Sequence, residues 1–160
     1  MLKRFMFLAI ALIAMIAFAN PASAQTDYYG CLDYVYMNKV KDPVHQNDPV
    51  AKGYDPLHTT LTANSNGTYD LELSDFKIGN MPGALYVYAK GVKMDGSVNE
   101  VKNAIVLDYA GGIKFTAQIT VTDFNASTGL LKYTVKSVNA KFLGISFDTE
   151  VHFTTTCTTK

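Results

Sequence analysis

The sequence has no excess of charge of either sign and little of the chemistry that marks an enzyme. It contains 14 Lys and Arg residues against 14 Asp and Glu residues. Proteins that hold phosphate backbones present a basic stripe, so this balance excludes nucleic acid as a partner. The sequence also has no Gly-rich phosphate loop, no serine in an elbow motif and no carboxylate pair in a setting that separates an acid from a base. It therefore predicts neither an enzyme nor a cofactor.

Histidine and cysteine are scarce as well. The three histidines, His45, His58 and His152, lie far apart in the sequence, and none has a neighbour at the spacing of metal ligands, so we expect no metal site. The two cysteines are Cys31 and Cys157. In an exported chain such a pair closes to a disulfide, and two free thiols are the alternative.

Long apolar runs are absent except near the N-terminus. There, Lys3 and Arg4 precede a run of 15 apolar residues at positions 5–19. The run is shorter than the roughly 20 residues that a membrane-spanning helix needs. This order of a basic start and a short apolar run is typical of a secretory signal peptide.

The end of the signal peptide is marked by small residues. Ala22 and Ala24 occupy positions −3 and −1 of a cut before Gln25. Residues 1–24 are therefore predicted to be removed, with an N-terminal membrane anchor as the alternative. The mature chain, 25–160, is predicted to be secreted or periplasmic. Because the residue after the cut is not a cysteine, we expect no lipid anchor there.

The mature chain has the length of a single domain. It would hold 136 residues, with 12 basic against 14 acidic side chains and thus a net charge of −2. This length is enough to bury one core and hardly enough for two. We expect a single domain that is not an integral membrane protein.

Apolar residues recur with period two almost throughout, and no helical stripe is present. Turn signals such as NSNG, DG, GG and STG separate the alternating stretches and favour hairpins. These features predict an all-β fold, an eight-stranded antiparallel up-and-down β-barrel. The predicted strands are 28–37, 57–63, 67–76, 84–93, 98–109, 112–123, 130–138 and 144–155.

One face of each predicted strand is apolar, and in a barrel that is dissolved in water this face points inward. The alternative is a barrel whose apolar face touches lipid. The residues assigned to the inner face include Leu32, Tyr34 and Tyr36; Tyr69, Leu71 and Leu73; Leu85, Val87 and Ala89; Ile113, Phe115, Ala117, Ile119 and Val121; and Ile145, Phe147, Val151 and Phe153.

The cysteines fit the closure of such a barrel. Closing the meander pairs the first strand with the last, and Cys31 opens strand 28–37 while Cys157 follows strand 144–155. Alternation places Cys31 on the outer face with Asp33. The disulfide would thus join the two strands at the seam, although a sandwich could also place its terminal strands together.

Strand parity places the longest connections at one end, which we call the mouth. Segment 39–56, with Pro43, Pro49 and Pro56, and segment 78–83 both fall there, a layout that favours a functional loop over a plain connector. The residues predicted to make contacts at the mouth are Val44, Val50, Tyr54 and Met81.

Three stretches carry a resemblance to a known family. The order of YYGCL at 28–32, NGTYDLELSDFKI at 66–78 and MPGALYV at 81–87 resembles the calycin-like β-barrel domain proteins that Bacteroidetes export. The resemblance implies a lipocalin-like fold for nearly the whole mature chain. It implies no catalytic residues, because the shared patterns mark strands and turns.

Two functions follow as hypotheses. In the first, the barrel binds a small apolar or amphipathic ligand, because an eight-stranded barrel has room for side chains or for one small ligand. The residues predicted to line the cavity are Tyr34, Tyr36, Phe115, Tyr133 and Phe147. In the second, side chains fill the barrel, and the loops 39–56 and 78–83 recognise a protein partner, as in an inhibitor or a surface module.

Overall fold

The computed structural model describes residues 24–38, 40–41, 57–78 and 81–157, and this part of the chain contains strands and no helix. Alternating apolar and polar residues, bounded by turn-forming residues, build each main strand. The strands are β1 (Gln25–Tyr29), β2 (Cys31–Met37), β3 (Val40–Lys41), β4 (His58–Ala63), β5 (Tyr69–Phe76), β6 (Leu85–Val92), β7 (Val98–Leu107), β8 (Ile113–Asn125), β9 (Leu130–Ser137), β10 (Lys141–Phe142), β11 (Ile145–Ser146) and β12 (Thr149–Thr154).

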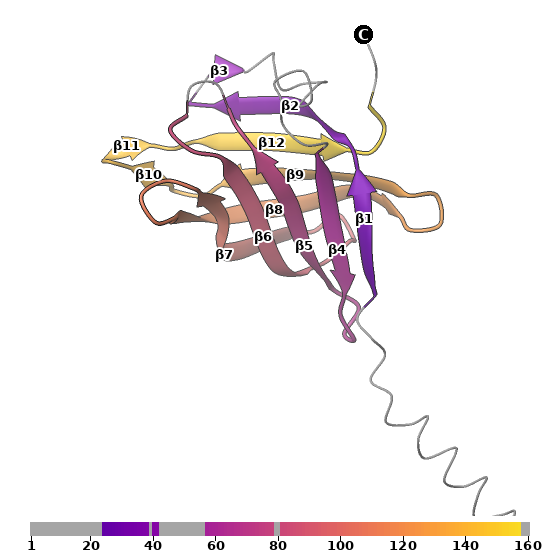
Figure 1. The fold of residues 1–160 in the computed structure, drawn as a ribbon. Coiled ribbons are helices and arrows are strands. Elements are labelled where there is room, and N and C mark those ends of the chain that lie inside the picture. Colours follow the sequence, from indigo (N-terminus) through magenta and orange to yellow (C-terminus); the bar gives the residue numbers. More distant parts are fainter. Residues whose placement is uncertain (1–23, 39, 42–56, 79–80, 158–160) are drawn as a thin grey trace, which may run out of the picture.

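Ten of these strands form one antiparallel sheet in the order β1-β4-β5-β6-β7-β8-β9-β12-β2-β3, and β10 pairs with β11 alone. From β4 to β9 each strand pairs with the next one along the chain. Figure 1 shows β4, β5 and β6 running steeply across the direction of β9, β12 and β2, so that the sheet curls around one interior.

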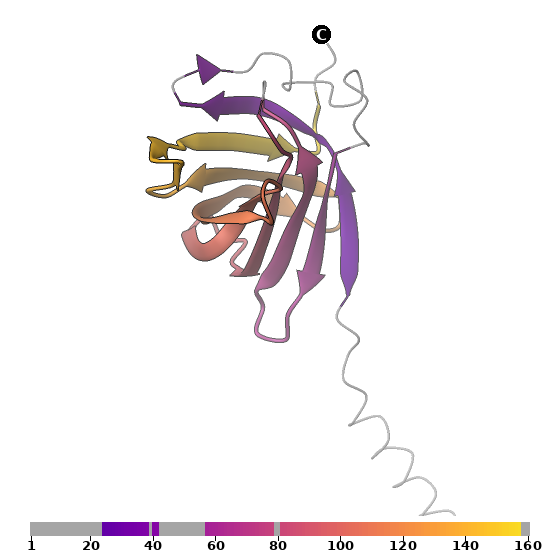
Figure 2. The same ribbon diagram turned by 60° about the vertical axis from the view of Figure 1, so that its left-hand side comes forward.

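The N-terminal strand closes the barrel. β1 pairs with β4, with Tyr29 opposite His58, and β2 pairs with β12, with Cys31 opposite Thr154. The two strands are consecutive in the chain but lie toward opposite ends of the sheet order. Figure 2 shows the chain changing direction between them. Counted as one bent strand, β1 and β2 give eight positions around the barrel, and the predicted antiparallel up-and-down fold is confirmed.

The predicted inward direction of the apolar faces is confirmed along most strands. In β5, Leu71 and Leu73 are buried while Glu72 between them is exposed. In β8, every second residue from Phe115 to Val121 is buried. The interior is therefore a packed apolar core. Its fully buried large side chains are Tyr133, Phe153, Leu32, Leu57, Leu61, Leu71, Leu73, Leu85, Leu107, Ile119 and Leu131.

In β2 the predicted inner face is wrong after Leu32. Leu32 and Val35 are buried, whereas Tyr34 and Tyr36 are half-buried on the opposite face. The cause is a β-bulge at Asp33, because Leu32 pairs with Phe153 while Tyr34 pairs with the adjacent His152. One extra residue in a strand moves all later side chains to the other face.

The last predicted strand, 144–155, is also divided. Its first residues form β11, in which Ile145 is 68% exposed, and its remainder forms β12 after a break at Phe147 and Asp148. Ile145 therefore does not continue the inner face of Phe147, Val151 and Phe153. Its backbone pairs with Phe142 of β10, which turns it away from the core.

The disulfide between Cys31 and Cys157 is confirmed. It joins two Cα atoms 5.9 Å apart and spans 126 positions of sequence. Cys31 lies on the face of β2 opposite Leu32, as predicted, but it is buried. The bond links the start of β2 to the segment after β12, the two strands that close the barrel. Such a bond is consistent with an oxidising compartment outside the cytoplasm.

Closure requires glycine at position 30. The amide of Gly30 donates a hydrogen bond to the carbonyl oxygen of Leu57 (3.0 Å). A Cβ atom there would overlap the carbonyl oxygen of Thr154 and lie 2.7 Å from Cζ of Phe153. The bend between β1 and β2 therefore packs directly against the backbone of β12.

We predict that Gly30→Ala destabilises the fold by about 1–3 kcal/mol, the usual cost of forcing an extra methyl group into a packed site. The melting temperature should fall by several degrees, as measured by circular dichroism. Thr26→Ala, at an exposed position of the same strand segment, is the control and should leave the melt almost unchanged. Equal melting temperatures for Gly30→Ala and the wild type would contradict the tight contact.

Reducing the disulfide should leave the fold intact and lower its stability. A native disulfide that closes a long loop contributes about 2–5 kcal/mol, and even 2 kcal/mol corresponds to a fall of about 4 °C or more in a domain of this size. Thermal melts of the oxidised protein, the reduced protein and the Cys31→Ser, Cys157→Ser double variant measure the effect. The last two should agree, and a reduced protein that melts with the oxidised one would contradict the prediction.

Candidate functional site

The middle of the barrel is filled by side chains. The ring of Tyr133 stacks on Phe153 with 5.1 Å between centroids, and its hydroxyl lies 2.6 Å from Oγ1 of Thr59. Burial raises the pKa of the Tyr133 phenol far above its ordinary value, although the hydrogen bond with Thr59 opposes the shift. Tyr133 is therefore a neutral, fully packed core residue.

A second aromatic pair lies on the inner faces of β8 and the segment before β12. Phe115 and Phe147 stack with 4.7 Å between centroids and an angle of 16°, and both are buried. Three of the five residues predicted to line a cavity, Phe115, Tyr133 and Phe147, are thus inside the barrel. Whether any of them binds a ligand stays a prediction.

The other two predicted lining residues belong to the outer surface. The ring of Tyr34 lies 4.7 Å from that of His152 and 6.5 Å from that of Tyr36. Glu150 accepts at 2.7 Å from His152 and at 3.3 Å from Lys136. Partial burial raises the pKa of the Glu150 carboxyl, but the bonds from His152 and Lys136 outweigh it and lower the pKa overall. Tyr34 and Tyr36 therefore lie on the outer face of the barrel, beside a hydrogen-bonded group of Lys136, Glu150 and His152.

A pocket of about 330 Å³ lies at the predicted mouth, and we call it the mouth pocket. Four chain segments meet there: the end of β2, the β5–β6 connection, the end of β7 and the β10–β11 hairpin with the residues after it. Its lining is mainly apolar and consists of Met37, Asn38, Met81, Pro82, Leu107, Phe142, Ile145, Ser146 and Phe147.

The structure places only one of the four residues predicted to make contacts at the mouth, and their role in binding stays a prediction. Met81 is buried and lines the mouth pocket. Val44, Val50 and Tyr54 lie outside the described residues. Sequence reasoning missed Met37, Leu107 and Phe142, although Met37 ends a predicted strand, Leu107 lies near the end of another and Phe142 follows a third.

Backbone hydrogen bonds fix the walls of the mouth pocket. The amide of Asn38 donates to the carbonyl oxygen of Asp148 (2.8 Å), and the Asp148 amide donates to Oδ1 of Asn38 (2.9 Å). On the other wall, the Asp108 amide donates to the carbonyl oxygen of Ala84 (2.8 Å). The ring of Tyr109 meets that of Phe142 edge-on, with 5.6 Å between centroids. The pocket is thus held by bonds between segments that are distant in sequence.

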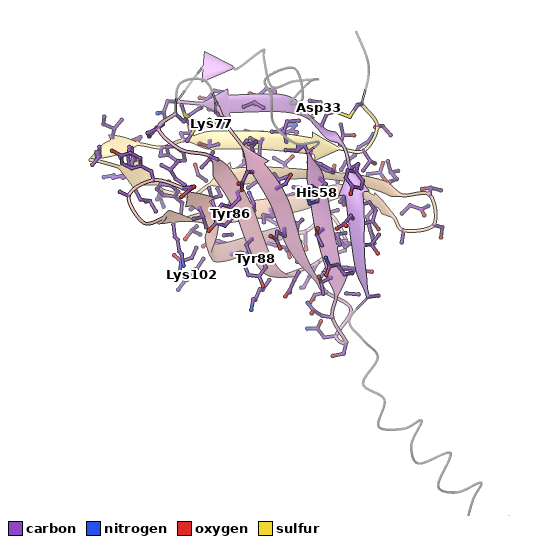
Figure 3. All side chains as sticks on the ribbon, viewed as in Figure 1. Asp33, His58, Lys77, Tyr86, Tyr88 and Lys102 are labelled. Carbon is purple, nitrogen blue, oxygen red and sulfur yellow. A yellow bond between two sulfur atoms is a disulfide. The ribbon has the colours of Figure 1, made fainter. Side chains whose placement is uncertain are left out.

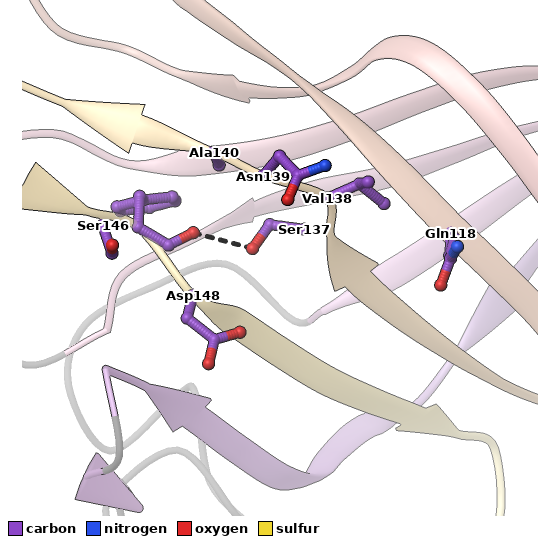
Figure 4. A pocket seen from close by; sticks show the side chains of 8 residues that line it. Gln118, Ser137, Val138, Asn139, Ala140, Ser146 and Asp148 are labelled. Carbon is purple, nitrogen blue, oxygen red and sulfur yellow. Dashed lines mark hydrogen bonds between the residues drawn. The ribbon is translucent and has the colours of Figure 1, made fainter.

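A more polar pocket of about 380 Å³ shares Phe147 and Ser146 with the mouth pocket, and we call it the side pocket. Figure 4 shows its lining, with Ser137 donating a hydrogen bond to the Phe147 carbonyl oxygen (2.7 Å). Oγ of Ser137 also accepts from the Thr149 amide (2.8 Å). Among the described residues that line it, Asp148 is the one titratable side chain. The side pocket therefore offers no acid and base pair.

Outside the two pockets, the described residues show neither a metal site nor a membrane-spanning helix. Figure 3 shows the side chains of His58, Lys77 and Lys102 at separate places on the ribbon. No three His, Cys, Asp or Glu side chains among the described residues are placed to hold a metal ion. Across residues 24–38, 40–41, 57–78 and 81–157, no helix is long and apolar enough to cross a membrane.

Comparison with protein-family models, with curated proteins and with solved structures finds no match for this chain.

The rim of the mouth pocket carries an exposed apolar hairpin. Phe142 of β10 pairs with Ile145 of β11, so Leu143 and Gly144 form a two-residue turn in which both have positive φ, 50° and 79°. Such turns favour Asn or Gly, because a branched side chain in the left-handed region is strained. Leu143 is nevertheless 82% exposed. An apolar residue held in a costly conformation at the surface is a feature that folding does not require.

We predict that Leu143→Asn stabilises the protein, because Asn tolerates the left-handed conformation. The gain should be about 1 kcal/mol, or a rise of about 2–5 °C in melting temperature. Gly144→Ala is the control with the opposite sign, since no atom lies near its added Cβ and only the backbone conformation opposes it. If Leu143→Asn melted below the wild type, the turn geometry would be wrong.

Proposed function

We propose that this protein binds a small apolar or amphipathic molecule in the mouth pocket. The observation that carries the proposal is an apolar pocket of about 330 Å³ that opens between four segments at one end of a nearly closed barrel. Pockets that bind small molecules begin at about this volume and combine apolar walls with a few polar groups. Here the polar groups are the side chains of Asn38 and Ser146.

The site differs from the one that the sequence suggests. The predicted ligand would lie deep in the barrel, but Tyr133, Phe153 and Thr59 pack against one another there. Phe147 still contributes, because it stacks on Phe115 from the core side and faces the mouth pocket with another part of its surface. The ligand is therefore expected at the top of the core, on a floor of packed side chains.

The proposal includes a location outside the cytoplasm. The disulfide fits an oxidising compartment, and the predicted signal peptide would deliver the chain there. The nearly closed antiparallel barrel is compatible with the calycin-like family that the sequence resembles. Membership of that family, and secretion or residence in a periplasm, remain part of the proposal.

We expect the mature protein to bind 1-N-phenylnaphthylamine, a neutral apolar probe whose fluorescence rises in apolar surroundings. Ile145→Lys should weaken this binding about tenfold, because it replaces an apolar wall of the mouth pocket by a charged side chain. A fluorescence titration measures the dissociation constant. Ile145 is 68% exposed, so the change should not disturb the core.

The matched control is Val98→Lys. Val98 begins β7, is 62% exposed and does not line the mouth pocket. It introduces the same charge at an apolar residue of similar exposure and should leave the dissociation constant unchanged. Absence of probe binding by the wild type, or equal weakening by both variants, would overturn the proposed site.

Recognition of a protein partner is a second candidate, and the strained, exposed Leu143 favours it. Apolar residues on a rigid turn are suited to contact a partner surface. Segment 39–56, on which the sequence-based form of this hypothesis depends, lies mostly outside the described residues. Leu143→Asn separates the two candidates, because it should weaken capture of a protein partner and spare binding of 1-N-phenylnaphthylamine.

A further inference from the structure

Among the residues that the structure describes, one buried side-chain oxygen has no hydrogen-bond partner. Oγ1 of Thr149 is enclosed, with the whole residue 3% exposed, and it makes no hydrogen bond to any residue that the structure describes. Buried hydroxyl groups are normally paired, because leaving one unpaired forfeits the hydrogen bonds that water made to it. This exception therefore calls for a physical reason.

The other two buried threonines show that the fold can satisfy such groups. Oγ1 of Thr59 lies 2.6 Å from the Tyr133 hydroxyl, and Oγ1 of Thr154 lies 2.9 Å from Oγ1 of Thr156. The backbone of Thr149 is satisfied as well, since its amide donates to Oγ of Ser137 (2.8 Å). Only its side-chain hydroxyl, among the buried threonine side chains of the described residues, is left over.

Thr149 is a neighbour of two residues that line the mouth pocket. It is the first residue of β12 and is buried, as are Phe147 just before the strand and Val151 and Phe153 along it. Its backbone pairs with that of Met37 across the β12–β2 seam. Phe147 and Met37 both line the mouth pocket, so Thr149 adjoins two residues of the pocket wall.

Met37 is the flexible part of this arrangement. Its unbranched side chain has three rotatable bonds and adapts to the shape of a neighbour more readily than Phe or Leu does. A polar group that entered between Met37 and Phe147 would approach Thr149, because Thr149 pairs with Met37 and lies two positions after Phe147. Ser137, on the neighbouring strand β9, already donates to the Phe147 carbonyl oxygen and accepts from the Thr149 amide.

We propose that the ligand of the mouth pocket carries a hydroxyl or carbonyl group on an otherwise apolar body and enters with that group first, so that it hydrogen-bonds to Oγ1 of Thr149. This inference rests on the proposed function of the mouth pocket and deepens it. A threonine hydroxyl both donates and accepts, so it suits either group. Uncharged amphipathic molecules with one buried polar end are the chemical class that this geometry selects.

The test compares two probes of nearly equal shape, 2-naphthol and 2-methylnaphthalene, as competitors of 1-N-phenylnaphthylamine. For the wild type and for Thr149→Val, we expect the ratio of the two dissociation constants to differ by about fivefold to tenfold, with the preference for 2-naphthol lost in the variant. Valine has the shape of threonine without the hydroxyl. Comparing ratios cancels the different affinities of the two probes for water.

Thr149→Ser, which keeps the hydroxyl, should retain the ratio of the wild type. Thr149→Val without probe should melt at or above the wild-type temperature, because it removes an unpaired buried hydroxyl. An unchanged ratio in Thr149→Val, with 1-N-phenylnaphthylamine still bound, would overturn this inference and leave the proposed function standing. Failure of the wild type to bind 1-N-phenylnaphthylamine would overturn the proposed function itself.

Discussion

The structure depends on how its first strand joins the two ends of the sheet. β1 adds to β4 and β2 adds to β12, and the bend at Gly30 brings the chain against the carbonyl oxygen of Thr154. An open sheet would expose long unpaired edges, and this nearly complete closure leaves little of them. The disulfide from Cys31 stabilises the same seam, since it connects the start of β2 to the chain just after β12. One short segment thus sets both the topology and the enclosure of the core.

Closure also decides where space remains. Because the sheet curls around one interior, the inward side chains of all its strands pack into the same space. Large residues around Tyr133 fill that space. Strand pairing is incomplete where connections leave the sheet, and the mouth pocket lies at such a place, between the end of β7 and the β10–β11 hairpin. The candidate site therefore arises from how the connections pack at one end of a filled barrel. It differs in this from a central ligand site inside a hollow barrel.

The alternation of apolar and polar residues was sufficient to predict most of the strands and their antiparallel order, although not the division of strand 28–37 at Gly30 into β1 and β2. The seam disulfide followed from the expected export and from the pairing of the first strand with the last, which depends on chain connectivity. The alternation gave the wrong faces for Tyr34 and Tyr36, because a β-bulge at Asp33 reverses them. No residue type in β2 signals such a bulge. The alternation failed again at Ile145, whose hairpin looks like the start of a strand. The mouth pocket was predicted only as an end of the barrel, because its walls come from four separate segments.

The polar atoms of the interior bear on the function proposed for the mouth end. Elsewhere in the interior, buried hydroxyl groups are hydrogen-bonded to one another: Thr59 to Tyr133, and Thr154 to Thr156. At the mouth, Thr149 keeps an unpaired hydroxyl and Leu143 a strained backbone, and both work against stability. Natural sequences depart from local rules mainly where another requirement acts. Two unrelated departures, one buried and one exposed, lie next to residues of the same pocket, and the proposed binding at that pocket would account for both.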